Sequence, residues 1–173
     1  MNTFAPFSLR YHNRDSGTSA APTRRVPIGA QGDTISTGDP VQVEGGVAAE
    51  YNAGDGIFGV ALYDFPTYDA DLGLRDGPDY NFPLIYPAND SESVYRVQAK
   101  LLESEEAQEV TADGVLGHSF NLAGATGAMY LDLSATGTDF LVIDIDRNVS
   151  EWGDLYPVLL VQIINPQDVD PTV

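Results

Sequence analysis

The chain has 173 residues, 43% of them hydrophobic, and contains no cysteine. This length supports one sizeable core or two small ones, and the missing thiols exclude disulfides, thiolate nucleophiles and thiolate metal sites. Eight basic and 26 acidic residues give a net charge of −18, which opposes binding to nucleic acid phosphates and to anionic membranes. No apolar run approaches the ~20 residues that span a bilayer, and the N-terminus lacks the apolar stretch of a signal peptide.

The first 25 residues are expected to form an extended arm that differs in charge from the rest. They carry four arginines and one acid, a charge of +3, whereas the remainder carries four bases and 25 acids, a charge of −21. No regular period runs through them, so a disordered tail is one interpretation. The other is an arm that docks on a partner, because aromatic side chains are typical interface anchors. The expected contact residues are Phe4, Phe7, Leu9, Arg10, Tyr11, Arg14, Arg24 and Arg25.

Residues 26–166 are predicted to form a β body, followed by a loose tail at 167–173. Short strands bounded by turn residues are expected first at 34–36, 40–44, 47–51, 57–65 and 83–88. The pair Gly45-Gly46 is a hairpin signal, and Gly59 inside its strand indicates a bulge or a close backbone approach. Residues 66–83 are expected to form a long acidic loop.

The second half of the chain continues the β pattern. Residues 93–102 alternate apolar and polar side chains, which predicts a half-buried strand followed by an acidic turn or one helical turn. Further strands are expected within 111–124, 127–135, 139–147 and 156–166. The segment 139–147 alternates so that Phe140, Val142, Asp144 and Asp146 share one face, and 156–166 is apolar enough for a central strand covered on both faces. The sequence therefore predicts an all-β fold, a small barrel or sandwich (β-tulip-like or jelly-roll-like) with an extended N-terminal arm.

Residues suited to chemistry are few. The two histidines, His12 and His118, have no orienting carboxylate that the sequence can identify, and His118 is interpreted as a turn residue. Asp144 and Asp146 point the same way on one strand, so a catalytic or metal-binding carboxylate pair is one interpretation. The other is an ordinary solvated face, which the acidic background favours. Trp152 is interpreted as a core plug, with an interface anchor as the alternative.

The acidic loop is a second candidate cation site. Five aspartates cluster within sixteen residues there, interleaved with Gly73 and Gly77, and calcium prefers several oxygen ligands, which a flexible loop can supply. The aspartates are Asp64, Asp69, Asp71, Asp76 and Asp79. Their spacing does not match an EF-hand and no glutamate closes the loop, so a solvated acidic loop is preferred and neither a metal nor a cofactor is predicted.

Three stretches share a pattern with a known family. One is residues 24–65, with an extended start, the corner "GDTISTGDPV" and strands ending in "GVAL". The second is "YPANDSESVYRVQA" running into "VLGHSFNLA", and the third is "GAMYLDLSATGTDFLVIDIDR" followed by an apolar strand. Together they resemble the capsid decoration (cement) proteins of tailed bacteriophages. The likeness covers most of residues 24–165 and lies in the pattern, not in a diagnostic motif.

The resemblance implies a structural virion protein without enzymatic activity. Such proteins bind the outer capsid surface, often as trimers, and many add a strand of an N-terminal arm to a sheet of the major capsid protein. The expected partners are therefore the major capsid protein and, on the capsid, two further copies of the chain, with no nucleic acid and no membrane. The alternative is a carbohydrate- or cation-binding β-module of the receptor-binding or lectin-like kind. A third hypothesis, an all-β hydrolase, would use Asp144 and Asp146.

Overall fold

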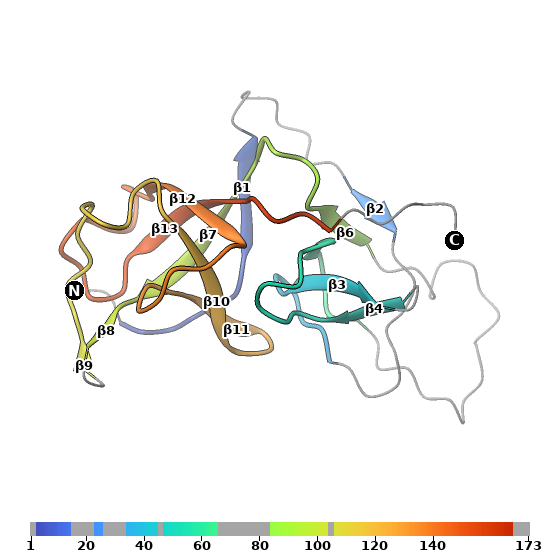
Figure 1. The fold of residues 1–173 in the computed structure, drawn as a ribbon, viewed down its shortest axis with the longest axis horizontal. Coiled ribbons are helices and arrows are strands. Elements are labelled where there is room, and N and C mark those ends of the chain that lie inside the picture. The colour runs from blue at the N-terminus through green and yellow to red at the C-terminus, as the bar shows by residue number, and fades with distance from the viewer. Residues whose placement is uncertain are drawn as a thin grey trace.

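The computed structural model describes residues 3–14, 23–25, 34–44, 47–65, 84–103 and 106–167. Figure 1 shows two β units beside each other, a closed barrel and a smaller open sheet. All regular elements among the described residues are strands, which confirms the all-β prediction. Nowhere in these ranges is there a helix of the length and apolarity needed to cross a membrane. All of the acidic loop at 66–83 and nearly all of the C-terminal tail at 167–173 lie outside the described residues.

Five strands close the barrel. Their order around it is β7 (Ser93–Lys100), β11 (Ala128–Asp132), β10 (Ser119–Ala125), β12 (Phe140–Ile145) and β13 (Val158–Ile163), and β13 pairs back onto β7. A sixth strand, β1 (Arg10–Arg14), pairs antiparallel with the first half of β7, and β11 pairs parallel with its end. Strand β1 is consequently the terminal strand of the barrel sheet.

Strand β7 pairs with β1, β11 and β13, and its side chains alternate between the two faces of the sheet. Tyr95, Val97 and Ala99 point inward and are buried, as predicted. Strand β13 is central as predicted, because it lies between β12 and β7. The prediction that it is covered on both faces was wrong, since Leu160 and Gln162 on its outer face are only half-buried.

Strand β12 departs from its predicted alternation. Its register against β13 shifts between Val142 and Asp144, the mark of a β-bulge. The bulge reverses the phase of the strand, so that Ile145, expected to face away from Phe140 and Val142, joins them in the core. Asp144 points outward instead of sharing the face of those two residues.

The smaller sheet has the order β2 (Arg24–Arg25), β6 (Leu84–Pro87), β5 (Gly59–Ala61), β3 (Pro40–Glu44) and β4 (Val47–Glu50). The register Glu44↔Val47 confirms the hairpin predicted from the glycine pair. The predicted close approach at Gly59 is also confirmed, because a Cβ there would lie 2.6 Å from the carbonyl oxygen of Tyr86.

One local prediction was wrong. Residues 34–36 form no strand; the buried Ile35 is held by one backbone hydrogen bond, its carbonyl accepting from the amide of Phe65 at 2.8 Å. After β7, β8 (Leu102–Glu103) pairs with β9 (Glu106–Ala107) in a small hairpin, and the acidic turn or helical turn expected there falls on residues 104 and 105, outside the described residues.

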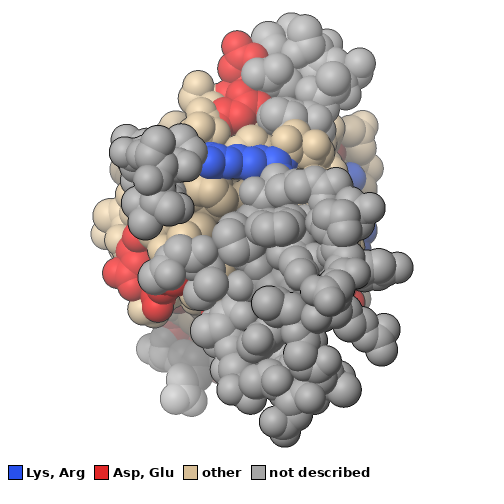
Figure 2. Space-filling view, turned by 90° about the vertical axis from the view of Figure 1, so that its right-hand side faces the viewer, with Lys and Arg blue, Asp and Glu red and all other residues tan. Residues whose placement is uncertain are grey.

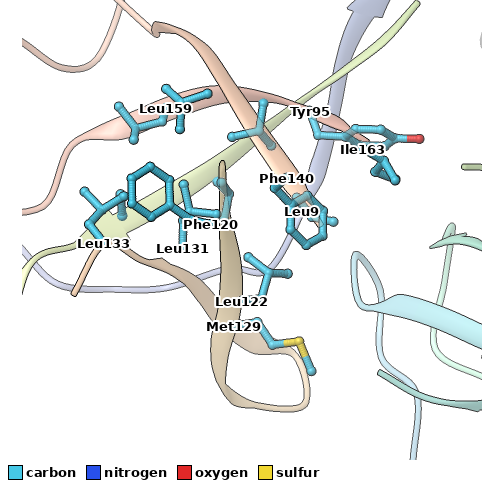
Figure 3. Packing of buried hydrophobic residues seen from close by; sticks show 14 of the residues in the cluster. Leu9, Tyr95, Phe120, Leu122, Met129, Leu131, Leu133, Phe140, Leu159 and Ile163 are labelled. Carbon is cyan, nitrogen blue, oxygen red and sulfur yellow. The ribbon is translucent and has the colours of Figure 1, made fainter. Parts of the chain in front are cut away.

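An apolar cluster and buried carboxylates connect the two units. The larger cluster, part of which Figure 3 shows, fills the barrel and extends to Ile57, Val60 and Ala88 beside the small sheet, which also covers a second cluster around Val41 and Ile85. At the junction Asp139 is fully buried and accepts hydrogen bonds from the Tyr51 hydroxyl (2.6 Å), the Gly54 amide and the Asn165 side chain (both 2.9 Å). Burial, with the hydrogen bond to Asp139, raises the pKa of Tyr51 far above its usual range.

Candidate functional site

The N-terminal segment, here residues 3–14, is folded onto the barrel. Leu9 is 1% exposed and lies within the same apolar cluster as Phe140 and Leu122 (Figure 3). Burying a leucine side chain contributes about 1.5–3 kcal/mol, which is ample reason for this segment to stay in place. The expectation that residues 1–25 form an arm separate from the body is therefore wrong for residues 3–14.

Aromatic contacts hold both ends of this segment. The Phe4 ring lies edge-on to Tyr130 at 5.3 Å between centroids and packs on Tyr156 at 5.1 Å. The ammonium of Lys100 lies 4.8 Å from the Phe4 centroid, a cation–π distance. Tyr11 stacks on the Tyr86 ring at 4.8 Å. Two of the three aromatic residues predicted to anchor a partner, Phe4 and Tyr11, thus contact their own chain.

Side-chain hydrogen bonds add to this attachment. The Ala5 amide donates to Oε1 of Gln98 at 2.8 Å, and Nε2 of Gln98 donates to the Thr3 carbonyl at 3.0 Å. Gln98 is buried on the outer face of β7 beneath the segment. These bonds satisfy its side-chain amide, which is shielded from water.

Asp39 forms a buried latch with Ser8. Asp39 is 2% exposed and accepts from the Ser8 hydroxyl at 2.7 Å, the Ser36 amide at 2.9 Å and the Gly127 amide at 2.9 and 3.0 Å. Ser8 itself has φ of 55° and exchanges two hydrogen bonds with the backbone of Met129, so its left-handed conformation is fixed from several sides. Burial raises the pKa of Asp39 above 3.8, against the effect of its hydrogen bonds.

The predicted basic contacts have different environments. The Arg10 guanidinium lies 4.5 Å from the centroid of the half-buried Phe7 ring, and Arg10 is exposed. The Arg24 guanidinium lies 4.7 Å from the centroid of Phe58 on the small sheet. Arg14 and Arg25 close β1 and β2, but their side chains lie outside what the structure describes. On the face seen in Figure 2, basic side chains make one short band and reappear at the right-hand edge, and acidic side chains lie above and below the band.

Strands β1, β7, β13 and β12 carry a hollow of about 330 Å³ on the outer face of the barrel. It is lined by the apolar side chains of Val94, Ile143 and Leu160 and by the polar residues His12, Asn13, Asp144 and Gln162. The hollow therefore unites one of the two histidines with one of the two carboxylates that the sequence singled out. Small binding sites likewise combine apolar side chains with a few polar groups.

Asp144 and Asp146 each form an ion pair with an arginine. Asp146 is 3% exposed and forms an ion pair with Arg96, with 2.6 Å between Oδ2 and Nε. Asp144 pairs with the exposed Arg147 at 3.3 Å and accepts from the amide of Ile145 at 2.8 Å. Both carboxylates thus already have cationic partners, an arrangement that favours structural ion pairs over a pair poised to exchange protons.

None of the remaining described candidates lines the hollow. Trp152 packs half-buried against the barrel core, in agreement with the core interpretation. His118 is exposed beside a turn, and its amide donates to the Val115 carbonyl at 3.1 Å. Of the five loop aspartates only Asp64 is described; it accepts from the amide and hydroxyl of Thr37, which lower its pKa. Among described residues no three His, Asp or Glu side chains gather to form a metal site.

Sequence reasoning did not identify the hollow or the latch. The apolar lining residues of the hollow come from three strands, and the latch joins residues up to 121 positions apart. Among the described residues Ser8 is the one non-glycine residue with a positive φ, and its local sequence gives no sign of this conformation. No protein-family model and no curated protein matches the chain.

Proposed function

We propose that the chain is a structural virion protein, which binds the outer surface of a tailed-virus capsid and joins neighbouring capsomers of the DNA-filled head. The observation that carries the proposal is strand β1. It is the terminal strand of the barrel sheet and exposes Arg10 and His12 on an otherwise acidic chain. Terminal strands offer unpaired backbone groups for pairing with another protein. The proposal assigns no catalytic step and no cofactor to the chain.

The charge distribution supports a protein partner. With −21 outside the first 25 residues, most of the chain repels polyanions, so attraction to the packaged DNA plays no part in the proposal. A partner that presents carboxylates to the basic strand would be steered to one face. Copies arranged as trimers by the capsid lattice would bind jointly, which turns a modest single contact into a strong collective one.

The experiment uses heads of the virus that encodes the chain, prepared without this protein. Added protein should sediment with expanded, DNA-filled heads at a fixed number of copies per head and should raise the temperature at which the heads release DNA. An unrelated acidic protein at equal concentration controls for crowding. If the wild-type protein fails to sediment with these heads, the proposal is refuted.

The hollow on the barrel favours a second candidate function, a carbohydrate-binding module. His12, Asn13, Asp144 and Gln162 supply hydrogen-bonding groups beside the apolar side chains of Val94, Ile143 and Leu160, which suits a sugar ring with polar edges and an apolar face. A glycan array followed by NMR titration tests it. Saturable shifts confined to Asn13, Val94 and Gln162, together with no binding to heads, would favour this candidate over capsid decoration.

A further inference from the structure

Several contacts hold the N-terminal segment on the barrel, so it is poorly suited to being donated to a partner. Phe4 packs between Tyr130 and Tyr156, and Leu9 fills a place in the barrel core. The Ser8 hydroxyl satisfies the buried carboxylate of Asp39. Donating this segment to a partner's sheet would break these contacts together, and would leave both a cavity and a buried carboxylate without one of its donors.

Strand β1 pairs with β7 through one edge, and no described strand pairs with its other edge while the segment stays in place. Its first edge pairs with β7 through Arg10↔Arg96, Tyr11↔Tyr95, Asn13↔Val94 and Arg14↔Ser93. In the sheet order no described strand follows β1 on its second edge. A terminal edge of this kind carries backbone donors and acceptors at strand spacing, which is the template for adding a strand.

The side chains of β1 specify the charge of a strand that could join it. Residues 3–14 contain two arginines and no acid. Arg10 lies directly opposite Arg96, whose charge is taken up by Asp146, and no ion pair ties Arg10 to a described acid. Opposite charges across adjacent strands stabilise a pairing and like charges oppose it. A strand with carboxylates beside Arg10 is therefore the favoured neighbour.

We infer that β1 is an acceptor edge, to which the capsid partner adds an extended segment bearing acidic side chains, while residues 3–14 stay folded on their own barrel. This inference rests on the proposed function and reverses the direction of strand donation that the resemblance implies. The negative charge on the remainder of the chain directs such a segment to β1, because an acidic strand is repelled elsewhere.

A disulfide lock distinguishes acceptor from donor. Asn13 and Val94 are directly opposed between β1 and β7, and the Cα spacing of opposed strand pairs falls in the range that a disulfide bridges. The double variant Asn13→Cys/Val94→Cys is tested on protein-free heads in its oxidised and reduced forms. An acceptor edge predicts equal binding by the two forms. Binding that disappears on oxidation and returns on reduction would show that the segment is released, and would overturn the inference.

A pair of charge reversals tests the edge without touching the fold. Arg10→Glu places a carboxylate against the incoming acidic strand and should weaken head binding about five- to thirtyfold. Arg147→Glu makes the same charge change at an exposed site after β12, three strands away, and should stay within about twofold of wild type. Equal effects of the two variants would overturn the inference.

The outcomes separate this inference from the function beneath it. Failure of the wild-type protein to bind heads removes both. If the wild-type protein binds heads but the oxidised disulfide variant does not, only the acceptor-edge inference is overturned. The same holds if the Arg10 and Arg147 variants weaken head binding equally. Sedimentation of the protein alone covers one more case: a dimer that Arg10→Glu dissociates would show that the edge serves a second copy, and would overturn its assignment to the capsid partner.

Discussion

Replacing Leu9 by alanine measures how firmly the N-terminal segment belongs to the body. Leu9 is 1% exposed in the barrel cluster, and the substitution removes three side-chain carbons. At about 0.8 kcal/mol for each buried methylene the transfer loss is about 2.4 kcal/mol, and the remaining cavity brings the expected loss of unfolding free energy to about 3–5 kcal/mol. For a chain of this size that lowers the melting temperature by roughly 6–20 °C.

The assay is urea unfolding followed by the fluorescence of Trp152, which packs against the same core. Hydrogen exchange at the amides of residues 10–14 gives a local measurement, and exchange there should accelerate in the Leu9→Ala variant. Phe7→Ala is the matched control, because Phe7 belongs to the same segment but lies outside the core cluster and is only half-buried. If Leu9→Ala costs less than about 1 kcal/mol, or no more than Phe7→Ala, the segment is not part of the folded core.

Three further predictions concern the junctions. Asp39→Asn should remove a pH dependence of stability, because burial raises the pKa of Asp39 in the folded protein. The difference in unfolding free energy between wild type and variant, measured by urea unfolding, should fall as the pH rises from below 3.8 through that raised pKa and then stay constant. A difference that instead grows with pH would show the opposite shift. Tyr51→Phe should cost about 1–3 kcal/mol in thermal unfolding, because Asp139 loses its 2.6 Å donor, and an unchanged melting temperature would disprove that role. Gly59→Ala should cost about 1–3 kcal/mol because its Cβ would press on Tyr86 and Ile85, whereas Gly114→Ala, at an open position, tests the cost of a positive φ without any clash.

The sequence predicted those parts of the fold that local pattern controls. The β3–β4 hairpin follows from the glycine pair between two β-type runs, and β7 follows from the strict alternation of Tyr95, Val97 and Ala99. The close approach at Gly59 follows from a glycine inside a strand, because a residue without a side chain weakens a strand unless a neighbour needs the space. In each case the signal lies within a short stretch of the chain.

Features set by distant contacts could not be read in the same way. Leu9 stands in a stretch with the composition of a tail, and what buries it is a barrel formed mainly by residues beyond position 93. The bulge at Ile143 leaves the alternation of residues intact while changing which of them face inward, so the pattern alone assigned Asp144 to the wrong side. The candidate hollow assembles from four strands, of which the sequence had singled out only His12 and Asp144 as chemically notable.

The latch between Ser8 and Asp39 also sets the order in which a growing chain can be completed. Two of its contacts belong to Gly127 and Met129, at the tip of the β10–β11 hairpin. At about 5–20 residues per second, the ribosome needs roughly 6–24 seconds after Ser8 to deliver those partners. The residues synthesised first are therefore among the last to find their places, and closing so long a loop makes that final step slow.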